Sequence, residues 1–159
     1  MPLPAPKHIK DLFEALLGRD VSLGDGVPVP LDARPRPTTA VYVDDSLSLS
    51  AVALMDFPLT AYSGAALALL PKGGAQDAID ESDLPASLLE NAAELLNVLA
   101  APIGEASGVH QRLHQTFGPD QLPPSDVSAW SARLGSRLDV ELDIKGYGKG
   151  TLSVVCTLG

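Results

Sequence analysis

Aromatic residues are scarce in this chain of 159 residues, at 4% of the sequence, although 45% of its residues are hydrophobic. The core must therefore be built mainly from Leu, Val and Ala side chains. A single cysteine, Cys156, excludes an internal disulfide, and its place in an alternating apolar run predicts a core residue. The length fits one domain, and we expect residues 1–159 to form it.

Long apolar runs and an excess of basic residues are also missing. No run reaches the ~18 apolar residues of a membrane helix, and the first residues lack the pattern of a secretory signal, so we expect a cytoplasmic protein with no membrane partner. Twenty Asp and Glu against eleven Lys and Arg give a net charge of −9, which opposes nucleic-acid phosphates. The acidic surface fits a partner with exposed basic residues, and it fits simple solubility equally well.

Hydrophobic periodicity predicts an α+β layout, with long helices packed on an antiparallel β-sheet. The first half of the chain is expected to form a helix over 7–17, an extended connector over 25–37 and a hairpin with one buried face (38–43 and 47–55). Two helices should follow: one from Pro58 that ends near 71–74, and one capped by Ser82 or Asp83 that runs to Pro102. A C-terminal hairpin is expected over 138–144 and 152–158. Residues 103–136 are rich in Gly, Pro and Ser, which predicts a helical extension followed by a long connection.

The segment "ENAAELLN" (90–97) lies in the expected helix before Pro102. Five apolar positions share one side of this helix, namely Leu88, Ala92, Leu95, Leu96 and Leu99. Glu90, Glu94 and Asn97 share the opposite side, because steps of four and three residues return to the same face. A solvated surface is the simpler interpretation of such a face. However, this face carries no Lys or Arg to pair with its carboxylates, and Asn is a poor helix former.

The Glu-x-x-Asn spacing of Glu94 and Asn97, with Glu90 four residues earlier, resembles the signature of the CheC/CheX/FliY family of chemotaxis phosphatases. That signature has Asp or Ser, three residues, Glu, two residues, Asn, and a proline about twenty-two residues later. Glu90 departs from it at the first position, and Pro119 lies one residue short of the last. The expected order of elements also resembles the family over nearly the whole chain, at the length of the CheX branch.

The resemblance implies a CheC/CheX-like fold and a phosphatase that acts on a phosphorylated receiver domain. Asn97 would be the catalytic residue that orients the attacking water, and Glu94 would pair with a lysine of the receiver, with Glu90 as a further partner-binding residue. No cofactor or metal is implied in this chain, because Mg²⁺ would belong to the receiver. The resemblance also implies a homodimer, for which the C-terminal strands would offer an edge. Two alternatives remain: a non-catalytic binding module that docks a signalling or flagellar-switch protein, and a relative whose polar face meets only solvent or another subunit.

Other candidate sites are weaker. His110 and His114 would share a helix face at a spacing that can bind a metal, but two surface histidines are a commoner explanation. The glycine-containing segments 72–74 and 146–150 lack the strand, spacing and helix start of a phosphate loop, so both are expected to be turns. Trp130 and Phe117 would fill the core or line a groove.

Overall fold

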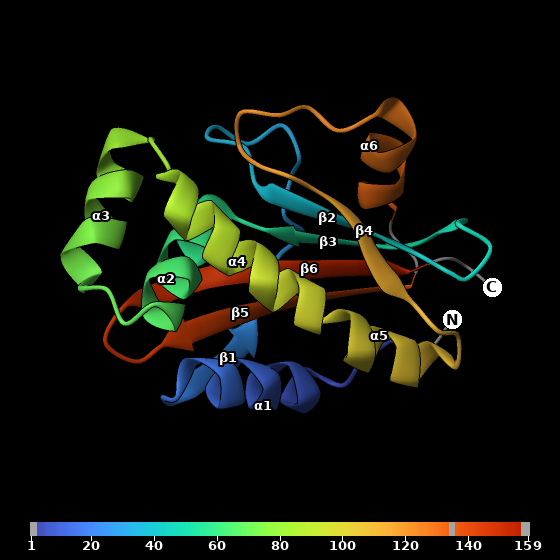
Figure 1. The fold of residues 1–159 in the computed structure, drawn as a ribbon, viewed down its shortest axis with the longest axis horizontal. Helices are drawn as coiled ribbons and strands as arrows, with labels where there is room; N and C mark the ends of the chain where they lie inside the picture. The colour runs from blue at the N-terminus through green and yellow to red at the C-terminus, as the bar shows by residue number, and fades with distance from the viewer. Residues whose placement is uncertain (1–2, 134–135, 157–159) are drawn as a thin grey trace.

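The computed structural model describes residues 3–133 and 136–156, and its centre is a six-stranded antiparallel sheet (Figure 1). The strands, in their order across the sheet, are β1 (Val21–Asp25), β5 (Arg137–Ile144), β6 (Gly148–Cys156), β3 (Leu49–Met55), β2 (Thr38–Val43) and β4 (Arg112–Phe117). The helices are α1 (Pro6–Leu17), α2 (Phe57–Leu67), α3 (Lys72–Glu81), α4 (Ala86–Val98), α5 (Ala100–Ser107) and α6 (Ser125–Ser131). This confirms the predicted α+β class.

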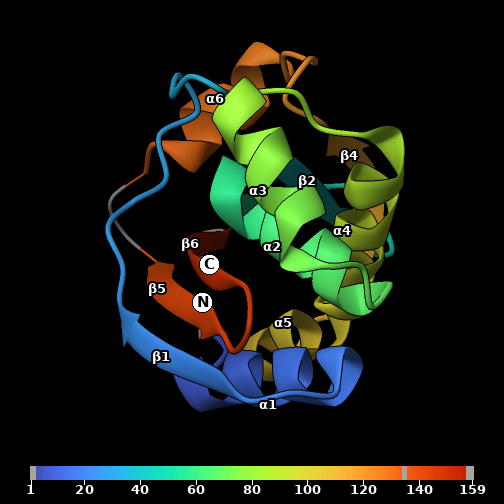
Figure 2. The ribbon, with the colours of Figure 1, turned by 90° about the vertical axis from the view of Figure 1, so that its left-hand side faces the viewer.

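The main hydrophobic core lies between one face of the sheet and helices α1, α2, α4 and α5 (Figure 2). Alternate residues of β2 and β3 point into it, including Ala40, Tyr42 and Ala53. Small side chains on α2 allow this helix to approach the sheet closely. Cys156 is buried in the same core, as its alternating run predicts.

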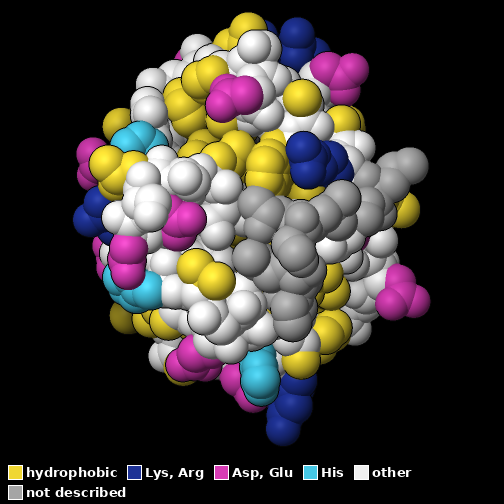
Figure 3. All heavy atoms as spheres, turned by 90° about the vertical axis from the view of Figure 1, so that its right-hand side faces the viewer, with side chains coloured by type: hydrophobic (Ala, Val, Ile, Leu, Met, Phe, Trp, Pro, Cys, Tyr) yellow, Lys and Arg dark blue, Asp and Glu magenta, His cyan; other side chains and the backbone are white. Residues whose placement is uncertain are grey.

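A second, smaller core covers the opposite face of the sheet. The proline-rich connector 26–37 and helix α6 lie over it and enclose Val41, Val52 and Leu54, with Phe117 and the Trp130 ring at its margin. The hairpin predicted over 38–55 is present as β2 and β3, which pair antiparallel. The prediction that only one of its faces is buried is wrong, because both strands are buried on both faces. In the end view of Figure 3 the hydrophobic side chains gather mainly in the upper half, on the side of α6.

Four elements were not expected: strands β1 and β4 and helices α3 and α6. The two strands form the edges of the sheet and are largely exposed, so their side chains do not alternate clearly between polar and apolar. Helix α3 has two buried residues, Ala75 and Ala78, so its apolar pattern in the sequence is weak. It begins with Lys72, Gly73 and Gly74, and the turn expected at 72–74 is therefore the first turn of a helix. The turn expected at 146–150 is present at 145–147, between β5 and β6. Leu158, expected in the last strand, lies outside the described residues.

The boundaries of α4 also differ from the prediction. Pro85 is the residue before its first turn, whereas Ser82 ends α3 in a left-handed conformation, so neither Ser82 nor Asp83 caps α4. The helix ends at Val98 because Pro102 has no N–H to donate to the Val98 carbonyl. The chain then continues as α5, which is the predicted helical extension.

Candidate functional site

The outer face of α4 carries Glu90, Glu94 and Asn97, and all three are exposed. The helix crosses the front of the molecule in Figure 1, so this face points away from the sheet. The three residues span about 10 Å along the helix axis, at 1.5 Å per residue. Within the described residues, none of the three side chains makes a hydrogen bond or an ion pair, so their polar atoms are available to a partner. The predicted orientation of this polar face is confirmed.

The inner face of α4 fixes where the polar face lies. The five apolar positions predicted to face the core, Leu88 to Leu99, are all buried. Asn91 Nδ2 donates to the Gly64 carbonyl of α2 at 3.0 Å. Gly64 has no side chain to separate the two helices, and a Cβ there would collide with the Leu88 carbonyl. The polar face is therefore held on a rigid support.

Tyr42 anchors the C-terminal end of α4, next to Asn97. Its hydroxyl, on strand β2, donates a hydrogen bond to the Leu96 carbonyl in the last turn of the helix. The last carbonyls of a helix lack partners within the helix, so this bond satisfies one of them. Burial raises the pKa of Tyr42 far above its ordinary value, and the phenol stays a neutral donor. This bond holds the main chain of Leu96 in place, and Asn97 is the next residue.

Comparison with solved structures assigns the fold. A chain in the Helicobacter pylori FliG–FliM complex superposes with a TM-score of 0.62 at 9% identity, covering 96% of this chain and 86% of that one. The H. pylori FliM middle domain gives 0.57 at 8% identity (96% and 84%), and the chemotaxis protein CheX from Desulfovibrio desulfuricans gives 0.54 at 11% identity (95% and 95%). This chain has the fold of CheX and of the FliM middle domain. No family model and no curated protein matches the sequence.

Pro119, the proline one residue short of the last position of the signature, lies near the start of α4, whereas Asn97 lies near its end. Pro119 follows β4 and lines a pocket of about 400 Å³ together with Ser82 and Leu84, which precede α4. Asn97 lies in the last turn of that helix. The signature positions that share the exposed face of α4 are therefore Glu90, Glu94 and Asn97 alone.

The two histidines do not share a helix face, because His114 lies in β4. His110 precedes that strand and pairs with Asp45 at 2.6 Å, between exposed side chains. In the ranges 3–133 and 136–156, no three His, Cys, Asp or Glu side chains gather as a metal site would require. The same residues contain no helix long and apolar enough to cross a membrane.

Trp130 and Phe117 belong to the second core. Trp130 Nε1 donates to the Val155 carbonyl of β6 at 3.2 Å, which fixes α6 to the sheet. Sequence reasoning missed a pocket beside this helix, between α6 and connector 26–37. Its lining comes from three distant parts of the chain, and the only signal in the sequence is the pair of arginines in "ARPRP" (33–37).

Proposed function

We propose that the polar face of α4, formed by Glu90, Glu94 and Asn97, docks on a phosphorylated receiver domain and promotes loss of its phosphoryl group. The observation that carries the proposal is that Glu94 and Asn97 are both exposed on one rigid helix face of a CheX-like fold. The sequence signature supplies the expected roles, and the geometry is compatible with them.

Asn97 is the proposed catalytic residue. Hydrolysis of an aspartyl phosphate requires a water placed in line with the bond between phosphorus and the aspartyl oxygen. The carboxamide of Asn97 can accept a hydrogen bond from this water and donate another to a phosphoryl oxygen. The water oxygen bonds to phosphorus as the aspartyl oxygen departs, and the products are inorganic phosphate and a free carboxylate. Mg²⁺ would be held by the receiver, so the contribution of this chain to catalysis would be to position the attacking water.

Glu94 is the proposed docking residue, and Glu90 adds negative charge one turn earlier. A lysine of the receiver would pair with the Glu94 carboxylate, which has no competing cation among the described residues. Binding through exposed charges is weakened by salt, so docking should weaken as ionic strength rises. The net charge of −9 attracts a basic surface of the partner in the same way, over a longer range.

Phosphate release tests the catalytic role. Purified receiver domains from the same genome, phosphorylated with acetyl phosphate, should lose phosphate faster when the chain is added. Asn97→Ala should remove this acceleration, a loss of about 100-fold, because the water is no longer positioned. Asn97→Asp, which keeps the size but cannot donate, should also fail. Unchanged decay with the native chain across the whole set of receivers would refute the catalytic proposal.

Glu94→Gln tests docking separately. It should weaken binding to the phosphorylated receiver, whereas Asp11→Asn, which removes one exposed carboxylate from α1, should leave binding unchanged. Equal binding by Glu94→Gln and the native chain would exclude the proposed ion pair.

A non-catalytic binding module is the second candidate. The observation in its favour is that one similar structure is a FliG–FliM complex, in which a protein of this fold is assembled with another protein. Receiver binding that depends on Glu94 without faster phosphate release would support this function and exclude catalysis.

A further inference from the structure

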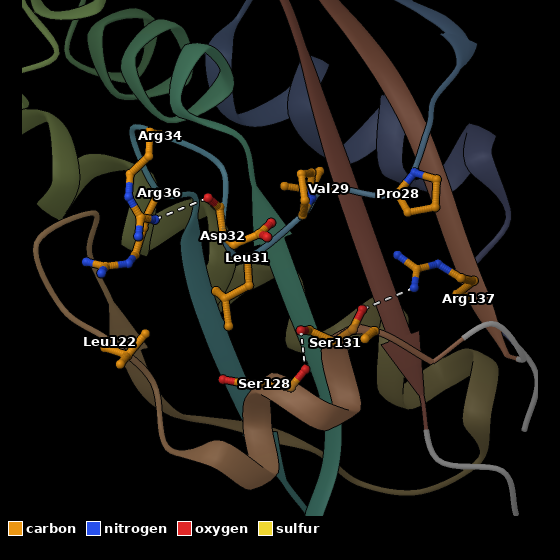
Figure 4. A pocket seen from close by; sticks show the side chains of 12 residues that line it. Pro28, Val29, Leu31, Asp32, Arg34, Arg36, Leu122, Ser128, Ser131 and Arg137 are labelled. Atoms are coloured by element: carbon orange, nitrogen blue, oxygen red, sulfur yellow. Dashed lines mark hydrogen bonds between the residues drawn. The ribbon is translucent and has the colours of Figure 1, made fainter.

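A pocket of about 590 Å³ lies on the face of the sheet opposite to α1, α2 and α4 (Figure 4). Connector 26–37 forms one wall, and α6 with the residues after it forms the other. The volume lies within the range of small-molecule sites, roughly 300–1,000 Å³. This pocket is separate from the polar face of α4, so neither proposal depends on the other.

The lining is mainly apolar. Val29 and Leu31 from the connector and Ala132 after α6 contribute to it, and Leu122 stands at its edge with 68% of its surface exposed. A large exposed leucine at the edge of an apolar pocket is surface that a ligand would remove from water. The body of a matching ligand is therefore apolar.

The charged side chains of the pocket are mostly positive, although the chain carries a net charge of −9. Arg34, Arg36 and Arg137 line it, with Asp32 as the single carboxylate. Arg34 donates to the Asp32 and Ala33 carbonyls, at 3.2 and 3.3 Å, which neutralises none of its charge. Arg36 has no hydrogen-bond or ion-pair partner among the described residues. In Figure 4 the Arg34 and Arg36 guanidinium groups lie at the same end of the pocket.

Arg137, at the other end of the pocket, has a structural role. Its guanidinium pairs with Asp139 at 2.9 Å, with only 8% of the side chain exposed, and donates to the Ser131 carbonyl at the end of α6. Asp139 accepts a hydrogen bond from Ser153, whose oxygen accepts the Val29 N–H at 3.0 Å. These bonds join both walls to the sheet, so the pocket is formed before a ligand arrives.

We propose that this pocket binds a small amphipathic carboxylate. The carboxylate pairs with Arg34 and Arg36, and the apolar chain lies over Val29 and Leu31 towards Ala132. Arginine suits this task because its planar guanidinium can donate two parallel hydrogen bonds to one carboxylate.

Decanoate is a suitable probe, and Trp130 is a built-in reporter because it is the only tryptophan and lies in α6. Titration of the full chain should show saturable binding at one site, by Trp130 fluorescence and by calorimetry. Decanol, which keeps the chain without the charge, and acetate, which keeps the charge without the chain, should each bind at least tenfold more weakly.

Two kinds of variant test the location. Arg34→Gln and Arg36→Gln should each weaken decanoate binding at least tenfold, while Arg112→Gln on β4, with the same loss of charge outside the pocket, should change it less than twofold. Ala132→Phe, which fills the pocket without a change of charge, should prevent binding. Thermal melting shows that each variant is folded.

Any of four results would overturn the proposal. One is the absence of saturable decanoate binding by the folded native chain. A second is equal binding of decanol and decanoate. A third is equal binding by Arg36→Gln and the native chain. The fourth is tighter binding of a short peptide of Asp and Leu than of decanoate, since that would assign the pocket to a protein segment.

Discussion

At the scale of single residues, Asp56 shows opposing effects of local structure and burial. It precedes α2, and its carboxylate accepts hydrogen bonds from the Leu59 N–H at 2.8 Å and the Thr151 N–H at 3.0 Å. These bonds favour the charged form, but burial outweighs them and raises the pKa of Asp56 above its ordinary value of 3.8. The side chain caps a helix and links it to β6 while it is partly removed from water.

Asp56→Asn should change how stability depends on pH. The folded protein holds the Asp56 proton to a higher pH than the unfolded chain does, so this group makes stability fall as pH rises from about 3.8 through the raised pKa. Asn has no such titration. The free energy of unfolding of the native chain minus that of Asp56→Asn should therefore decrease as pH rises across this window. Urea unfolding from pH 3 to 7 measures it, and a difference that increases with pH would contradict the direction of the shift.

At the scale of elements, the contact between α2 and α4 determines where the polar face lies. Helix α2 is built from small residues, and Gly64 meets the main chain of α4 at Leu88. The sequence predicts this close packing in general terms from "YSGAALA" (62–68). It does not identify α4 as the neighbour, because the small residues of α2 would suit any closely packed element.

Gly64→Ala should destabilise the protein by about 1–3 kcal/mol, because the added methyl group forces α4 away from α2. Gly73→Ala is the matched control in a helix. Nothing lies within 4 Å of a Cβ at Gly73, so this substitution should be neutral or stabilising by up to about 1 kcal/mol. Denaturant unfolding of both variants measures the difference. Equal stabilities would show that α4 is not in tight contact with Gly64.

At the scale of the whole molecule, the sheet order determines where another copy could pair. The C-terminal strands were expected to offer this edge, but β5 lies between β1 and β6, and β6 lies between β5 and β3. The expected edge was therefore wrong. Within residues 3–133 and 136–156, the strands with an unpaired side are β1 and β4.

The homodimer stays a prediction, and the two copies would pair through β1 or through β4. Light scattering should give twice the 16.5 kDa mass of the chain. Leu23→Lys on β1 or Gln115→Lys on β4 should shift the mass towards that of one chain, according to which edge is used, because edge lysines oppose strand pairing. A native mass equal to one chain at high concentration would refute the dimer.

The sequence by itself determined the local features of this protein. The β-rich segment 38–43 with alternation in 47–55, and the alternation in 138–144 and 152–158, predicted both hairpins. The spacing of Leu88 to Leu99 predicted which face of α4 is buried and that Glu90, Glu94 and Asn97 point outward. Such features depend on the period with which side chains change direction along one strand or helix, and residues close in sequence are enough to reveal that period. Only the tertiary structure decided the edge strands, the burial of both sheet faces and the arginine-lined pocket. Edge strands pair through main-chain groups common to all residues, and the pocket joins segments near residues 30, 122 and 137, whose proximity no local pattern records.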